Sequence, residues 1–183
     1  MRKSFFSWFF GLIFLCNWTS AIFSEEIRME SSNKNWSVFV PKNKKECFVA
    51  SQSVKDEAFR NGEKLSSVNR DRGILYVKQS PSSPAGFYGV FSAGYPLKIG
   101  GKFLLTIDNK SKIVFLATPE PKSSKEKNWA WTQSHDDAKL VDQLKVGNKA
   151  IMEAISHRGT ITKDTFILTG FTKAIQRLRE ICG

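Results

Sequence analysis

The chain has 183 residues, of which 41% are hydrophobic and 13% aromatic, and it carries a formal net charge of +11. This apolar content excludes a wholly disordered chain, and the length predicts one domain with a segment to spare for targeting. The positive charge indicates either anionic partners or a solvated, lysine-rich surface, and the even spread of the basic residues favours the second.

The first 24 residues, 1–24, have the composition of a secretory signal peptide. Two basic residues precede an apolar stretch over residues 5–18, which is shorter than the ~20 residues that span a bilayer. Small residues follow, so we expect cleavage after Ala21 or after Ser24. An uncleaved anchor is the alternative. Cleavage would leave residues 25–183 as a single exported domain.

Two cysteines, Cys47 and Cys182, remain after the signal peptide is removed. Export places them in an oxidising compartment, so we expect one disulfide that closes almost the whole mature chain. On the chain-entropy account, such a bond stabilises the fold by ~3–5 kcal/mol. The alternative is a cytosolic protein with two buried free thiols. Cys16 suggests a lipoprotein as a further alternative, but the residue before it, Leu15, is bulky where a lipoprotein signal has a small residue.

Short strands separated by turns make up most of the mature chain. The clearest hairpin has Asp108–Ser111 as its turn. We expect a loop or an irregular hairpin at 55–72 and a polar loop at 119–128. Many short strands joined by turns predict an antiparallel β-sandwich. The strand candidates are residues 36–40, 46–54, 73–78, 87–95, 103–107, 113–116, 129–131, 149–156 and 160–169.

Two segments have helical patterns. A short middle helix is expected to be capped by Ser134 and to end at Gly147. A C-terminal helix over about 171–181 is amphipathic, because its apolar residues recur at helical spacing. That stripe ends at Cys182, so the disulfide would attach the helix to the sheet. The stripe consists of Phe171, Ala174, Ile175, Leu178 and Ile181.

An ordered set of short sequence pieces carries a family resemblance. With these pieces the chain resembles the invasion-associated locus B family of bacterial exported proteins over roughly residues 36–182. The pieces are W-S-V-F at 36–39, A-G-Y-P at 93–96, A-W at 130–131, L-V at 140–141, L-K-V-G at 144–147, S-H-R-G-T at 156–160, D-T-F at 164–166 and L-T-G-F-T-K-A at 168–174.

The resemblance implies an immunoglobulin-like antiparallel β-sandwich, export to the periplasm or cell envelope, and no known enzymatic chemistry. The family takes its name from an association with the invasion of host cells. This chain lacks the cysteine pair that many members carry before the middle helix, so no second disulfide is expected.

The two histidines are the starting points for any catalytic site. His135 lies beside Asp136 and Asp137, where a metal or general-base role is conceivable, but acidic residues in a first helical turn are favoured by the helix dipole alone. His157 and Arg158 lie on a predicted hairpin turn. We therefore predict a protein that is not an enzyme, without catalytic residues, cofactor or metal.

Arg158 and His157 are the candidate partner-binding residues, because Arg158 could bind an anionic group of a partner; the alternative is a simple exposed turn. The favoured function is an interaction protein that is periplasmic, outer-membrane-associated or secreted, with a protein partner in the envelope or the host. Loops 55–72 and 119–128 are further candidates for partner binding.

Two alternative functions stay open. One is a salt-sensitive binder of polyanions such as lipopolysaccharide, and the other is an uncharacterised enzyme; nucleic acid is not expected as a partner.

Overall fold

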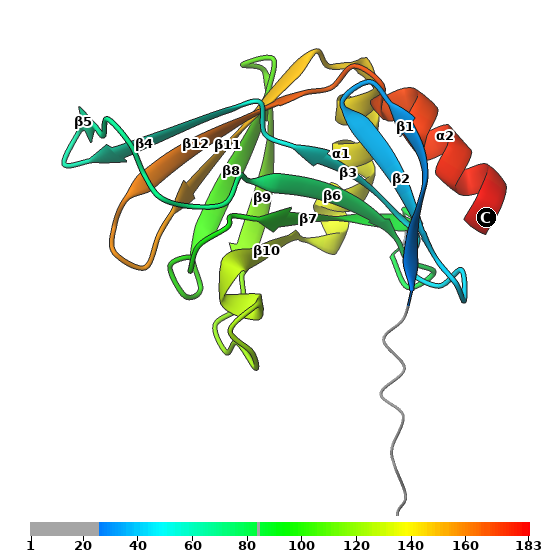
Figure 1. The fold of residues 1–183 in the computed structure, drawn as a ribbon, viewed down its shortest axis with the longest axis horizontal. Helices are drawn as coiled ribbons and strands as arrows, with labels where there is room; N and C mark the ends of the chain where they lie inside the picture. Colours follow the sequence, from blue (N-terminus) through cyan, green and yellow to red (C-terminus); the bar gives the residue numbers. More distant parts are fainter. Residues whose placement is uncertain (1–25, 84) are drawn as a thin grey trace, which may run out of the picture.

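The computed structural model describes residues 26–83 and 85–183, and the predicted signal peptide, residues 1–24, lies outside them. The described residues form twelve strands and two α-helices (Figure 1). The strands are β1 (Ile27–Asn33), β2 (Trp36–Pro41), β3 (Phe48–Gln52), β4 (Lys55–Arg60), β5 (Glu63–Lys64), β6 (Ile74–Gln79), β7 (Phe87–Ser92), β8 (Lys102–Ile107), β9 (Ser111–Ala117), β10 (Trp129–Thr132), β11 (Lys149–Ile155) and β12 (Ile161–Ile167). The helices are α1 (Ser134–Val146) and α2 (Phe171–Cys182), with a short 3-10 helix at Glu126–Asn128.

All twelve strands belong to one antiparallel sheet, in the order β1-β2-β3-β6-β7-β10-β9-β8-β11-β12-β4-β5. The predicted all-β, sandwich-like fold with a middle and a C-terminal helix is confirmed. Its facing layers are made by a single hydrogen-bonded sheet in place of the two separate sheets of an immunoglobulin domain.

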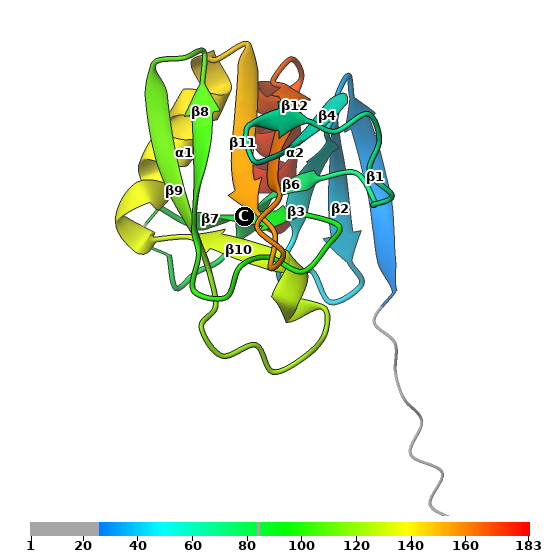
Figure 2. The ribbon, with the colours of Figure 1, turned by 90° about the vertical axis from the view of Figure 1, so that its left-hand side faces the viewer.

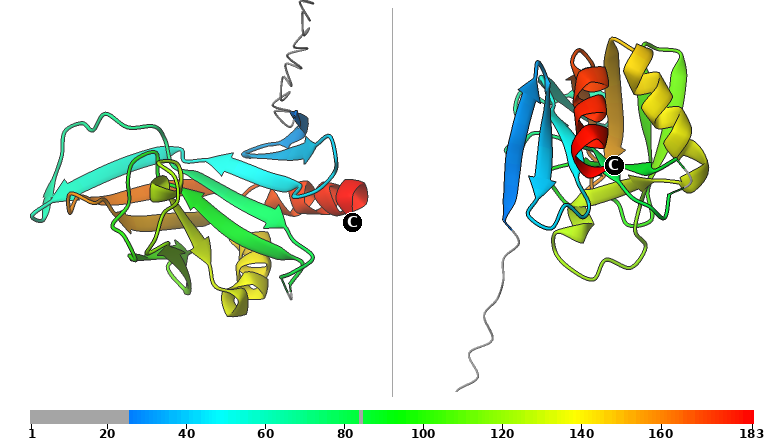
Figure 3. Two further views of the ribbon diagram at one scale, coloured as in Figure 1. Left: turned by 90° about the horizontal axis from the view of Figure 1, so that it is seen from below. Right: turned by 90° about the vertical axis from the view of Figure 1, so that its right-hand side faces the viewer.

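The sheet turns back on itself where β3 runs into β4. β3 pairs with β6, whereas β4 pairs with β12. Between them, the Ser53 N–H donates to the Gly73 carbonyl (2.9 Å), and the Val54 N–H donates to the Thr165 carbonyl (2.8 Å). One continuous stretch of chain therefore takes part in both layers, as a corner strand does in orthogonal packing (Figure 3).

The charged stretch 55–72 contains a hairpin followed by a loop. β4 and β5 are joined at Asn61 and Gly62, which have φ values of 52° and 84°. Positive φ at both turn positions is typical of Asn-Gly hairpin turns. The irregular-hairpin reading of this stretch is therefore correct for its first part, and residues 65–73 form the loop.

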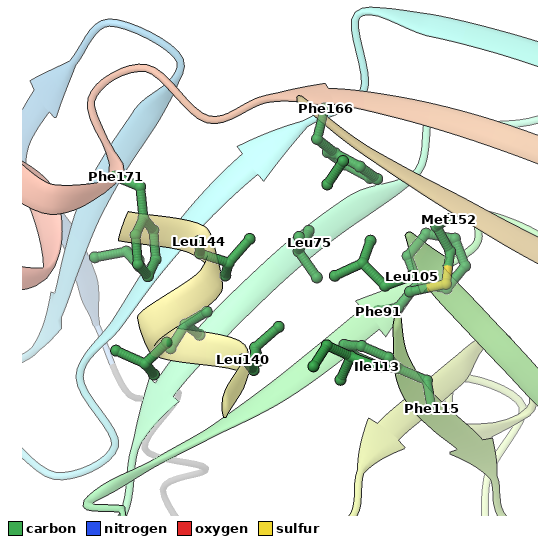
Figure 4. Packing of buried hydrophobic residues seen from close by; sticks show 14 of the residues in the cluster. Leu75, Phe91, Leu105, Ile113, Phe115, Leu140, Leu144, Met152, Phe166 and Phe171 are labelled. Atoms are coloured by element: carbon green, nitrogen blue, oxygen red, sulfur yellow. The ribbon is translucent and has the colours of Figure 1, made fainter. Parts of the chain in front are cut away.

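The core lies between the facing parts of the sheet and beneath the helices. Phe91 on β7 and Phe166 on β12 pack edge to face with ring centroids 6.5 Å apart, although their strands are not neighbours in the sheet (Figure 4). Helix α1 covers β7 and β9, and α2 covers β1, β2 and β3. Seen from the β11–β12 end, both helices lie behind the strands (Figure 2).

The predicted apolar stripe of α2 and its disulfide are confirmed. Four stripe residues, Phe171, Ala174, Ile175 and Leu178, are buried, and the Cys47–Cys182 bond joins the end of α2 to the start of β3. In the part of the chain that the structure describes, no helix is long and apolar enough to cross a membrane.

Candidate functional site

The two predicted partner-binding residues lie in the turn between β11 and β12, at the end of the molecule away from α2 (Figure 1). Ser156 organises this turn, because its Oγ accepts hydrogen bonds from the N–H groups of Arg158 (3.3 Å) and Thr160 (3.1 Å). Gly159 follows with a φ of 80°, which glycine adopts without strain. The predicted turn is confirmed, and it leaves the side chains of His157 and Arg158 exposed.

The turn borders a hollow of about 350 Å³. The backbone N–H of His157 donates to the Pro96 carbonyl (3.0 Å), which fixes the turn against the segment after β7. The exposed rim of the hollow consists of Val68, Asn69, Pro96, His157 and Arg158. The half-buried or buried floor consists of Arg70, Tyr95, Ser156, Thr160 and Thr162.

A buried ion pair lies at the floor of the hollow. The Arg70 side chain is 6% exposed and forms a close ion pair with Asp164, which is 0% exposed. Arg70 Nη1 also donates to the Ala93 carbonyl (3.1 Å), and its Nη2 lies 3.7 Å from Asp56 Oδ1. The Arg70 Nε is buried without a hydrogen-bond partner in the described residues. This arginine anchors an otherwise exposed loop to the body of the domain.

Burial raises the pKa of two groups here, the Asp164 carboxyl of the pair and the neighbouring Tyr95 hydroxyl. It raises the pKa of Asp164 to about 7, although Arg70 acts in the opposite direction; Asp56 adds to the rise. Burial likewise raises the pKa of Tyr95 to about 12. The Tyr95 hydroxyl is hydrogen-bonded to Thr162 Oγ1 (2.6 Å), so the ring forms a neutral, fixed part of the floor.

Sequence reasoning found the rim of this site but missed its floor. Arg70 was placed in a polar loop, and its partner Asp164 lies 94 residues away in the chain. One signal was present, since Thr162, Asp164 and Phe166 alternate in the strand and all three are buried. A charge in phase with apolar core residues indicates a buried partner.

The first turn of α1 uses its acidic residues structurally. Gln133 occupies the N-cap position and makes no side-chain capping bond, so the prediction that Ser134 caps the helix is wrong. Asp137 is buried and accepts hydrogen bonds from Thr132 and from Ser83 Oγ (3.0 Å). These contacts attach the start of the helix to the sheet and replace a local cap.

His135 lies on the outside of the same turn. Its side chain is 77% exposed, and its Nε2 lies 3.7 Å from Asp136 Oδ2. That carboxylate also accepts a hydrogen bond from the Val114 N–H (3.4 Å). Over residues 26–83 and 85–183, no group of three or more His, Cys, Asp or Glu residues is arranged to hold a metal ion.

The chain is similar to one protein family in sequence and to one crystal structure in fold. The sequence pattern of the family described as "Invasion associated locus B (IalB) protein" matches residues 36–179, a span that includes the whole hollow. The crystal structure of invasion associated protein B from Bartonella henselae has a similar fold, with a TM-score of 0.57. The two chains are 16% identical, and the match covers 84% of this chain and 97% of that chain. No curated protein matches the chain.

Proposed function

The chain belongs to the invasion associated locus B protein family, and on that premise we propose that it is an exported interaction protein. It acts in the periplasm, at the outer membrane or after secretion, and it binds a protein partner of the envelope or the host. The signal-peptide pattern of residues 1–24 supports export, and the Cys47–Cys182 disulfide suits an oxidising compartment. The family name supports a contribution to host-cell invasion.

The hollow beside the β11–β12 turn is the observation that carries this proposal. Its exposed rim is formed by two loops and a turn that connect strands of one continuous sheet, which is how rigid scaffolds present binding loops. Ser156 Oγ accepts two backbone hydrogen bonds within the turn, and these bonds hold the turn that carries the exposed side chains of His157 and Arg158.

Site-specific photocross-linking in intact cells tests the proposal. We would place a photoreactive residue at Val68, on the rim, and at Val146, which is 76% exposed at the end of α1, as the matched control. Mass spectrometry should identify a protein joined through position 68 and not through position 146. Equal capture from both positions, or capture from neither, would contradict binding at the hollow.

Polyanion binding is the second candidate, and the net charge of +11 favours it. Affinity that comes from many dispersed cations should fall steeply with salt, and the loss of one arginine should change it little. Binding to lipopolysaccharide that is insensitive to salt would exclude this candidate. Binding that depends strongly on Arg158 alone would favour the interaction protein.

A further inference from the structure

We propose that the hollow recognises an acidic side chain next to an aromatic one on the protein partner. The occupant is a short acidic-aromatic segment whose carboxylate lies against the arginines of the site and whose ring lies against Tyr95. This inference rests on the proposed function, since it names the part of the partner that the same site would bind.

The charge of the lining favours an anion. Among the ten described residues that line the hollow there are two arginines and a histidine, and none is Asp or Glu. Arg158 is exposed, and in the described residues it forms no ion pair. A guanidinium that is free of internal carboxylates can bind a partner's carboxylate through two parallel hydrogen bonds.

A third arginine adds to this positive field. Arg60, at the end of β4, donates from Nη2 to Thr160 Oγ1 (2.7 Å), and Thr160 lines the hollow. The carboxylate of Asp164 is engaged by Arg70. Asp164 and Asp56 therefore neutralise the buried Arg70, whereas Arg60 and Arg158 form no ion pair in the described residues and are left to attract an anion.

Apolar surface lies directly beside these cations. The Tyr95 ring is in the floor, where it offers an uncharged aromatic surface. Pro96 and Val68 continue the apolar surface on the rim, where Val68 is 38% exposed. The Arg70 guanidinium carbon lies 5.4 Å from the Tyr95 ring centroid. Aromatic rings pack well against such a mixture of ring and guanidinium.

The shape of the site favours a side chain of a larger partner over a free small acid. The volume of about 350 Å³ is near the lower end of ligand pockets. Half of the lining residues are exposed, whereas small-molecule sites enclose most of their ligand. Anchor side chains at protein interfaces need only a partial pocket, because the surrounding contacts exclude water.

Titration of matched dipeptides tests this inference. The probes are N-acetyl-Asp-Phe-amide, its neutral analogue N-acetyl-Asn-Phe-amide, and N-acetyl-Asp-Ala-amide, which lacks the ring. They would be added to the isotope-labelled, disulfide-bonded protein and followed by the amide signals of residues 68–70 and 156–160. We expect the Asp-Phe probe to shift these signals, and each analogue to bind at least tenfold more weakly.

Two substitutions make the test specific. Arg158→Gln should weaken binding of the Asp-Phe probe at least tenfold while signals away from the hollow keep their positions. Arg177→Gln is the matched control, because Arg177 is 46% exposed on α2 and does not line the hollow. It should leave binding unchanged.

Several outcomes would overturn the inference. They are equal binding of the charged and neutral probes, shifts on another surface, and tighter binding of phenylacetate than of the Asp-Phe probe. If position 68 captures a partner while the probes fail, the acidic-aromatic inference is wrong and the proposed function stands. Failure of both experiments would remove both.

Discussion

The two ends of this domain are held together by different forces. At the α2 end, Trp36 and Phe171 are fully buried with ring centroids 4.8 Å apart, and a disulfide joins helix to sheet. At the opposite end, the loop beside the hollow is attached through Arg70 and its buried pair with Asp164. Apolar packing and a covalent bond stabilise the first end at little electrostatic cost. The second end keeps buried charge where the candidate site lies, and a buried ion pair is weak evidence for stability.

The disulfide is expected to give the largest effect. Replacing Cys47 and Cys182 by Ser together removes a cross-link between residues 135 apart in the sequence. On the chain-entropy account, the free energy of unfolding should fall by about 5 kcal/mol, less any strain in the bond. Urea unfolding of the oxidised and substituted proteins measures the difference. Unchanged midpoints would show that the α2 end is held by packing alone.

Removing one partner of the buried pair should give the next largest effect. Arg70→Met leaves Asp164 and Asp56 without their cation, and breaking a buried pair in this way costs about 3–5 kcal/mol. The double variant Arg70→Met with Asp164→Leu should recover most of the loss, since both charges are then gone. Urea unfolding of the two variants distinguishes these cases. A double variant as unstable as the single one would mean that Arg70 acts mainly through its hydrogen bond to the Ala93 carbonyl.

The same contrast explains what could be predicted from the sequence. The disulfide could be predicted from residue type, because the expected cleavage of residues 1–24 would leave only two cysteines, Cys47 and Cys182. The apolar stripe of α2 followed from helical spacing. The partner of Arg70 did not follow, because 17 acidic residues could have served and sequence spacing does not select among them. The loop that carries Arg70 comes close to Asp164 on β12 only when β4 pairs with β12 and closes the sheet.

Closure of the sheet was hidden for a related reason. β4 has Ala58 as its one buried residue, so its charged sequence resembles a solvated loop. Its pairing with β12 depends on backbone hydrogen bonds, which carry no signature in side-chain hydrophobicity. A strand such as β4, which has one buried side chain and pairs through its backbone, is therefore difficult to recognise from its amino-acid composition.

The pH dependence of the free energy of unfolding should show a smaller effect, which arises only at the end that contains Asp164. Burial raises the pKa of Asp164 to about 7, so the folded state binds this proton more tightly than the unfolded state does. The stabilisation that comes from protonated Asp164 is fully present below about pH 4, and it is lost as the pH rises through 7. Between pH 5 and pH 8 we expect a loss on the order of 2 kcal/mol.

The double variant Arg70→Met with Asp164→Leu is the control for this titration. It removes the titrating carboxyl and its cation, while Asp56 and Tyr95, which also face Asp164, remain. Urea unfolding at the two pH values should show a smaller pH dependence in the variant than in the wild type. The same dependence in both proteins would assign it to groups outside this cluster.

The smallest effect is expected one residue away from Asp164. Lys163 points to solvent on the same strand and lies 3.1 Å from Glu153 on β11, with side chains that are 44% and 51% exposed. Exposed pairs contribute less than about 1 kcal/mol, because water screens the charges and two flexible side chains must be ordered. Glu153→Gln should therefore barely move the urea midpoint, and added salt should remove what difference there is. The contrary outcome is that Glu153→Gln destabilises the protein as much as Arg70→Met does. In that case burial would not be what distinguishes the Arg70–Asp164 pair from the Lys163–Glu153 pair, and the contrast between the buried and the exposed charges of this end would fail.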